Sequence, residues 1–111
     1  MTVSIEVHDA HSGMPVAQLP VRFERRADDG WEVVACHRTD TEGRVAKWEP
    51  EDDCALSYRC VLDTDRYFTG LGLNSFYPEI IVALRLSDRD PSLRVTVLAA
   101  AHAYLVQNEY G

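Results

Sequence analysis

The sequence predicts an all-β protein, a β-sandwich of seven or eight short strands with one short helix. Apolar and polar residues alternate with a period of two in several short segments, as they do in strands that bury one face. Clusters of Gly, Pro, Asp and Ser separate these segments, which is typical of turns between strands. The length of 111 residues, 46% of them hydrophobic, suits one core, so we expect residues 1–111 to form one domain.

The N-terminal half contains the first three expected strands. Residues 2–9 form the first, because apolar side chains at positions 3, 5 and 7 alternate with polar ones at 4, 6 and 8. The alternation returns at 21–25, and the Ala-Asp-Asp-Gly segment at 27–30 predicts a hairpin loop. The return strand is expected at 31–39, and a turn follows at 41–44.

The remaining strands are expected in the C-terminal half. An acidic, proline-broken loop at 49–53 precedes a strand at 54–62. Residues 79–86 are rich in β-branched side chains, which favours a strand, and residues 93–98 again alternate apolar and polar side chains. Three consecutive alanines then form a tight corner, after which a last strand begins at residue 104.

Between these strands, residues 64–71 predict the short helix. Asp63 or Thr64 is of a type that caps a helix N-terminus, because its side-chain oxygen can accept a hydrogen bond from a free backbone N–H. Gly70 and Gly72 end the helix, since glycine adopts the backbone conformations found after a helix C-terminus.

The net charge excludes several classes of function. Eleven Lys and Arg against 18 Asp and Glu give a formal charge of −7. A protein that neutralises nucleic-acid phosphates needs a basic face, so we expect no nucleic-acid partner. An anionic membrane surface is disfavoured for the same reason. No apolar run approaches the roughly 20 residues that cross a bilayer, and the N-terminus lacks the pattern of a signal peptide.

The three cysteines are Cys36, Cys54 and Cys60. An odd number without a signal peptide indicates reduced thiols and a cytoplasmic protein. Cys54 and Cys60 would share a strand face but lie about 20 Å apart, too far for a disulfide. We therefore expect the cysteines to be buried as small hydrophobic side chains.

Five motifs carry a resemblance when they are taken in order. They are Val-His-Asp-Ala-His-Ser-Gly-Met-Pro at 7–15, Arg-Arg-Ala-Asp-Asp-Gly-Trp-Glu at 25–32, Thr-Asp-Thr-Glu-Gly-Arg at 39–44, Asp-Thr-Asp-Arg-Tyr-Phe at 63–68 and Ser-Phe-Tyr-Pro-Glu at 75–79. At this spacing they resemble the transthyretin family, which includes vertebrate thyroid-hormone carriers and 5-hydroxyisourate hydrolases that open a purine-derived ring. The resemblance implies a transthyretin-like two-sheet sandwich, a homotetramer built as a dimer of dimers, and ligand sites in a channel between dimers.

The resemblance also implies where a hydrolase site would lie. In that family the site uses a first-strand His, an Arg after a Thr-x-x-Gly turn, a His on the penultimate strand, and a C-terminal Tyr-Arg-Gly-Ser. Arg44 matches the arginine. Glu6 and Arg94 stand at the two histidine positions, and Gln107 stands at the tyrosine position. One retained position and three replaced ones imply an altered active site.

Alternation places further polar residues on the faces that line the channel in this family. The candidate catalytic residues are Glu6, His8, Arg44 and Arg94, and the candidate substrate-binding residues are Ser4, Thr96, Gln107 and Glu109. Glu6 and His8 are suited to proton transfer, whereas Arg44 and Arg94 are suited to holding an anion or polarising a carbonyl. Titratable groups that converge in one cleft are typical of proton-transfer sites.

We expect no metal and no cofactor. His8 and His11 are the histidines nearest each other in sequence, but strand spacing puts them on opposite faces. The sequence also contains no Cys-x-x-Cys pair that would hold a structural zinc ion.

These observations lead to one main hypothesis and several alternatives. The main hypothesis is a small-molecule enzyme that resembles 5-hydroxyisourate hydrolase but has altered catalytic residues. It would open, close or condense a ring of a heterocyclic or carbonyl substrate by acid–base chemistry, for example a Pictet–Spengler-type cyclisation in specialised metabolism. The first alternative is a genuine 5-hydroxyisourate hydrolase of purine catabolism, with Glu6 and His8 in place of the two histidines. The others are a non-catalytic small-molecule carrier and an interaction module without a channel ligand.

Overall fold

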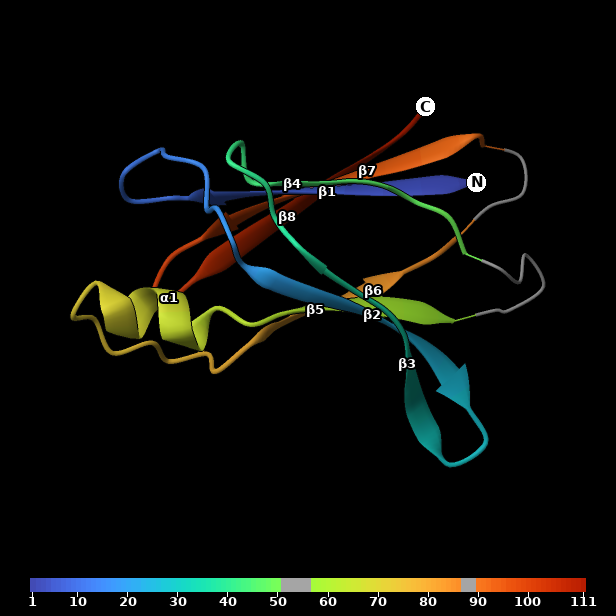
Figure 1. The fold of residues 1–111 in the computed structure, drawn as a ribbon, viewed down its shortest axis with the longest axis horizontal. Coiled ribbons are helices and arrows are strands. Elements are labelled where there is room, and N and C mark those ends of the chain that lie inside the picture. The colour runs from blue at the N-terminus through green and yellow to red at the C-terminus, as the bar shows by residue number, and fades with distance from the viewer. Residues whose placement is uncertain (51–56, 87–89) are drawn as a thin grey trace.

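A computed structural model describes residues 1–50, 57–86 and 90–111, and it shows two four-stranded sheets with one short helix at one end (Figure 1). The elements are β1 (Thr2–Asp9), β2 (Pro20–Ala27), β3 (Gly30–Arg38), β4 (Arg44–Trp48), β5 (Tyr58–Leu62), α1 (Asp65–Gly70), β6 (Ile80–Leu84), β7 (Ser92–Ala99) and β8 (Tyr104–Tyr110). The predicted all-β sandwich with its single short helix is confirmed.

The strand order decides which side chains become neighbours. One sheet has the order β4-β1-β7-β8 and the other the order β3-β2-β5-β6. β1 and β7 are parallel, although they lie at opposite ends of the described chain, whereas β1 pairs with β4 and β7 pairs with β8 in antiparallel fashion. The outward side chains of these four strands therefore form cross-strand rows on one face.

The core lies between the two sheets. Strand β1 buries alternate residues, so that Val3, Ile5 and Val7 contribute to it. From the other sheet, Phe23 is fully buried and stacks on Trp48, with ring centroids 4.1 Å apart. Because each large apolar side chain removed from water contributes about 1.5–3 kcal/mol, these inward residues fix which face of β1 points outward.

One strand was not expected from the sequence. β4 begins at Arg44, the last residue of the predicted turn at 41–44, and its pairing with β1 contains a bulge. Val3 pairs with Trp48 and Ile5 with Val45, so β4 has one extra residue between these pairs. Lys47 has a φ of 46° at this point. The extra residue breaks the period of two, which is why alternation fails to reveal this strand.

Two expected strands are shorter in the structure. β5 begins at Tyr58, whereas the sequence predicted a strand from residue 54. Residues 51–56, which hold Cys54 and most of the predicted acidic loop, lie outside the described residues. β6 covers Ile80–Leu84 within the predicted 79–86.

The cysteine prediction is correct for one residue and wrong for another. Cys60 is buried in the core, and this burial raises the pKa of its thiol to about 12. Cys36 is exposed instead, because it points away from the core on β3, at the edge of its sheet.

Asp9 joins the end of β1 to the helix. Its Oδ1 accepts hydrogen bonds from the backbone N–H groups of His11 and Ser12, and its Oδ2 accepts one of 2.6 Å from the hydroxyl of Tyr67. Burial by itself would raise the pKa of Asp9, but these hydrogen bonds hold it below its ordinary value. Asp9 is therefore a buried, fully bonded carboxylate that fixes the turn after β1.

Removal of the Tyr67 hydroxyl should reduce stability in a pH-dependent way. Tyr67→Phe is expected to lower the free energy of unfolding by about 1.5–3 kcal/mol at neutral pH, since it removes a hydrogen bond to a charged group. A carboxylate with a lowered folded-state pKa stabilises the fold above its unfolded-state pKa and loses that contribution as pH falls through the folded-state pKa. Urea unfolding at pH 7 and pH 3 should therefore show a smaller difference from wild type at pH 3. Tyr104→Phe is the control, because Tyr104 is partly exposed and its ring remains; an equal loss in the control would contradict the prediction.

Candidate functional site

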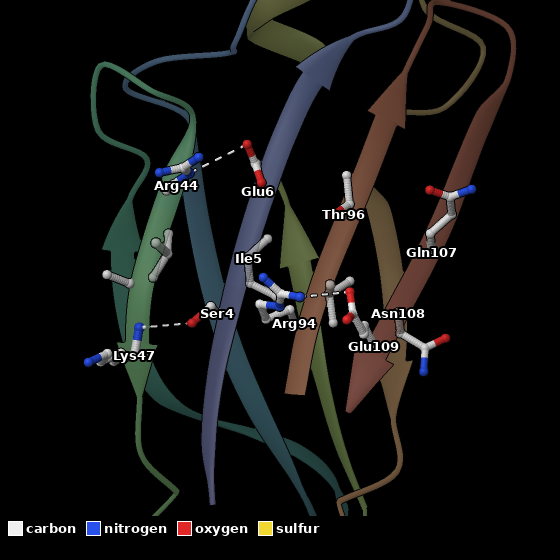
Figure 2. A pocket seen from close by; sticks show the side chains of 13 residues that line it. Ser4, Ile5, Glu6, Arg44, Lys47, Arg94, Thr96, Gln107, Asn108 and Glu109 are labelled. Atoms are coloured by element: carbon white, nitrogen blue, oxygen red, sulfur yellow. Dashed lines mark hydrogen bonds and ion pairs between the residues drawn. The ribbon is translucent and has the colours of Figure 1, made fainter. Parts of the chain in front are cut away.

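An open cleft of about 820 Å³ lies on the outward face of the β4-β1-β7-β8 sheet (Figure 2). All four strands of this sheet contribute to its lining, so residues from both ends of the sequence meet there. The lining residues are Ser4, Ile5, Glu6, Arg44, Val45, Ala46, Lys47, Arg94, Val95, Thr96, Gln107, Asn108 and Glu109.

Strand register arranges the polar side chains in rows. Glu6 pairs with Arg44 on one side and with Thr96 on the other, and Thr96 pairs with Gln107. We call Arg44, Glu6, Thr96 and Gln107 the central row. A second row, the Arg94 row, lies two residues along the strands and comprises Ser4, Arg94 and Glu109.

Glu6 is the most strongly connected residue of the central row. Its Oε1 accepts a hydrogen bond of 2.9 Å from Nε2 of His8 and lies 3.4 Å from Nε of Arg44. The hydrogen bond with His8 is the main cause of a lowered pKa for Glu6; its partial burial acts in the opposite direction, and the charge of Arg44 adds to the lowering. Glu6 is therefore an ionised carboxylate that holds the imidazole of His8.

A tight turn places Arg44 beside Glu6. The carboxylate of Asp40 accepts hydrogen bonds of 2.9 Å from the backbone N–H groups of Glu42 and Arg44. Gly43 has a φ of 78°, and a β-carbon there would lie 2.4 Å from the carbonyl oxygen of Val7. Only glycine fits this position without displacing the backbone of β1.

The guanidinium of Arg44 has two acidic neighbours. It lies between Glu6 and the carboxylate of Glu42, to which Nη1 donates a hydrogen bond of 3.0 Å. Arg44 is half-exposed, so this guanidinium has free N–H groups that face solvent and the cleft.

Arg94 and Glu109 pair in the other row. Nη2 of Arg94 lies 2.7 Å from Oε2 of Glu109, and the two side chains are 63% and 68% exposed. Figure 2 shows this pair well separated from the pair of Glu6 and Arg44. The cleft thus contains two separate pairs of opposite charges.

The structure brings most of the predicted site residues together. Seven of the eight line the cleft: Ser4, Glu6, Arg44, Arg94, Thr96, Gln107 and Glu109. His8 lies two residues after Glu6 on β1, outside the lining, but its imidazole contacts the site through its hydrogen bond with Glu6. The catalytic and substrate-binding roles of these residues stay predictions.

Sequence reasoning missed Lys47. Its backbone N–H lies 3.4 Å from Oγ of Ser4, and the residue lines the cleft from the bulge in β4. Because the bulge has no signature in the alternation of apolar and polar residues, only the three-dimensional pairing reveals this position.

In the described residues, no three His, Cys, Asp or Glu side chains lie close enough together to hold a metal ion. The helix described at residues 65–70 is too short to cross a membrane, and no longer apolar helix is found in the ranges that the structure describes.

The comparisons with known proteins agree with this architecture. Residues 3–107 match the model of the HIUase/Transthyretin family. The chain is 30% identical over 103 residues to a 5-hydroxyisourate hydrolase of Salmonella typhimurium, which covers 92% of this chain and 76% of that protein.

Solved structures show the same fold. A 5-hydroxyisourate hydrolase of Klebsiella pneumoniae superimposes with a TM-score of 0.83 at 20% identity, covering 98% of this chain and 99% of the other. Sea bream transthyretin in complex with thyroxine gives a TM-score of 0.86 at 20% identity, covering 98% and 95%. With these matches along nearly its whole length, the chain belongs to the HIUase/transthyretin family.

Proposed function

We propose that this chain is a small-molecule hydrolase that opens a ring by cleaving a C–N bond, and that 5-hydroxyisourate is the first substrate to test. The observation that carries the proposal is the contact of Glu6 with both His8 and Arg44 at the edge of the cleft. The relationship to the Salmonella hydrolase supports the same class of reaction.

The site contains the groups that such a hydrolysis needs. His8 is the general base, because imidazole can take a proton near neutral pH. Glu6 holds the imidazole and stabilises the imidazolium that forms, as a carboxylate does in a Ser-His-Asp triad. Arg44 faces the cleft as a cation that stabilises the negative charge of a tetrahedral intermediate.

The proposed hydrolysis consumes one water molecule, and His8 carries the proton from that water to the leaving nitrogen. Water adds to a ring carbonyl carbon while His8 takes one of its protons, and the carbonyl oxygen becomes an oxyanion beside Arg44. The oxyanion then reforms the carbonyl, the ring C–N bond breaks, and His8 returns the proton to the leaving nitrogen. The product is the ring-opened acid or its anion, and no oxidant or second substrate is consumed.

Freshly generated 5-hydroxyisourate tests the proposal. The protein should accelerate the loss of its ultraviolet absorbance above the spontaneous rate, in proportion to enzyme concentration, and Arg44→Ala should lower kcat/KM by about 100- to 1,000-fold. Arg38→Ala is the control, since Arg38 lies on β3 in the other sheet. A rate equal to the spontaneous one would exclude this substrate.

A ring-closing or condensing reaction on the same site is the second candidate. The observation that favours it is the replacement of three of the four family positions by Glu6, Arg94 and Gln107. The same proton donor and cation would then activate a carbonyl toward an amine instead of water. Incubation of amine and carbonyl pairs, with products identified by mass, separates this candidate from hydrolysis; a tightly bound ligand recovered unchanged would favour a carrier.

We further propose a homotetramer built as a dimer of dimers. The face that holds the cleft is uncovered in the single chain, so a second copy placed on it would turn the cleft into a closed channel. Light scattering during gel filtration should give about four times the 12.5 kDa mass of one chain. A monomer mass at micromolar concentration would contradict the proposal.

A further inference from the structure

The Arg94 row of the cleft is not used by the proposed hydrolysis. Arg94 stands opposite Ser4 on β1 and opposite Glu109 on β8, two residues along the strands from the central row. At about 3.3 Å per residue, this row lies roughly 7 Å along the strands from Glu6 and roughly 13 Å from the backbone of His8. It is therefore close enough to contact another part of a molecule that reacts beside Glu6.

Arg94 can easily exchange the carboxylate of Glu109 for another carboxylate. Both side chains are about two-thirds exposed, so water screens their charges and the pair itself adds little stability. The guanidinium has five N–H donors, and Nη2 is the group within 2.7 Å of the carboxylate of Glu109. Its remaining donors suit the planar, two-pronged geometry of a second carboxylate.

Ser4 provides a hydroxyl group next to Arg94. Its Oγ lines the cleft and accepts a hydrogen bond of 3.4 Å from the backbone N–H of Lys47, so the hydroxyl proton is available for donation to an anion. Lys47 also lines the cleft, but Figure 2 shows its side chain directed away from Arg94, so Arg94 is the cation of this row. Figure 2 shows Arg94 and Ser4 on adjacent strands, and both line the cleft.

We propose that Arg94 and Ser4 bind a carboxylate substituent of the substrate, so that the preferred substrate is a carboxylated heterocycle. The ring lies over the central row, and its carboxylate displaces Glu109 from Arg94. This inference rests on the proposed function in that both place a small ring in the same cleft. It adds an anionic group that the acid–base chemistry alone does not require.

Two planar rings that differ in one carboxylate test the proposal. Orotate is uracil with a carboxylate on the ring, so the pair isolates that group. By calorimetry at low ionic strength, orotate should bind at least ten times more tightly than uracil, and 0.5 M salt should reduce the difference. Equal affinities for the two rings would overturn the proposal.

Three substitutions assign the difference to Arg94. Arg94→Gln should abolish the preference for orotate and leave the affinity for uracil within about twofold, because only the carboxylate loses its partner. Glu109→Gln should strengthen orotate binding severalfold, since the competing carboxylate is gone. Arg66→Gln, on the exposed side of α1, is the matched control and should change neither affinity.

The outcomes separate this inference from the proposed hydrolysis. If the protein prefers orotate through Arg94 but does not accelerate 5-hydroxyisourate decay, the hydrolysis of that substrate fails and the carboxylate site stands. If it accelerates the decay but Arg94→Gln keeps the orotate preference, the carboxylate site fails and the hydrolysis stands. Circular dichroism of each variant confirms that the binding changes do not come from unfolding.

Discussion

Substitution of His8 by glutamine should lower the kcat for ring opening by about 100- to 10,000-fold, the range that a general base contributes. Glutamine can still donate a hydrogen bond to Glu6, but it cannot take a proton from water. Stopped-flow absorbance with fresh 5-hydroxyisourate measures the effect. His11→Gln is the control, because His11 lies in the turn after β1 and its backbone N–H, which bonds Asp9, remains.

Glu6, the hydrogen-bond partner of His8, allows a second test of the role of His8. Because Glu6 acts through the imidazole that it holds at 2.9 Å, the double variant Glu6→Gln/His8→Gln should be about as slow as His8→Gln alone. If the fold-reductions in kcat from the two single substitutions multiply in the double variant, Glu6 contacts the substrate independently of His8. The hydrogen bond from His8 lowers the pKa of Glu6, so Glu6 stays ionised and its protonation should not limit the rate near neutral pH.

Substitution of Gly43 by alanine should damage both the fold and the site. The added β-carbon would lie 2.4 Å from the carbonyl oxygen of Val7 and 3.1 Å from the β-carbon of Pro15, and alanine is strained at a φ of 78°. We expect a loss of about 2–4 kcal/mol in the free energy of unfolding, measured by urea titration. The shift of the backbone should also move Arg44 from Glu6 and lower kcat/KM.

Gly13 provides the matched control. It has a φ of 75°, close to that of Gly43, but a β-carbon there would meet no atom within 4 Å. Gly13→Ala should therefore cost only the backbone strain, about 1–2 kcal/mol, and leave the site intact. Equal losses in stability for the two variants would show that the contact with Val7 is unimportant.

Most of the fold follows from alternation, and the exceptions have local causes. β1 and β7 each bury every second residue, so the period of two is visible in their sequences. β4 is different because its bulge puts two residues between the inward-facing Val45 and Trp48. A pattern search with a fixed period cannot register that extra residue.

The candidate site was predictable to the extent that it depends on which face a side chain occupies. Alternation placed Glu6 and Arg94 on the outward faces of their strands, and the family resemblance indicated that these faces meet. The partners were not predictable, because the hydrogen bond of His8 to Glu6 and the pairing of Arg94 with Glu109 depend on rotamers and register. Lys47 was missed because the bulge in β4 leaves no signature in the alternation of apolar and polar residues.

The parallel pairing of β1 with β7 affects how a newly made chain can fold. The ribosome releases Thr2–Asp9 before the other strands of its sheet, and β4 can pair with one edge of that strand once Trp48 has emerged. The other edge must wait for Ser92–Ala99, which takes several seconds more at about 5–20 residues per second. Until then an apolar strand with open hydrogen-bonding groups is exposed to other nascent chains. A pause in translation before residue 92 should therefore increase aggregation, and the acidic charge of the chain counteracts such contacts by repulsion.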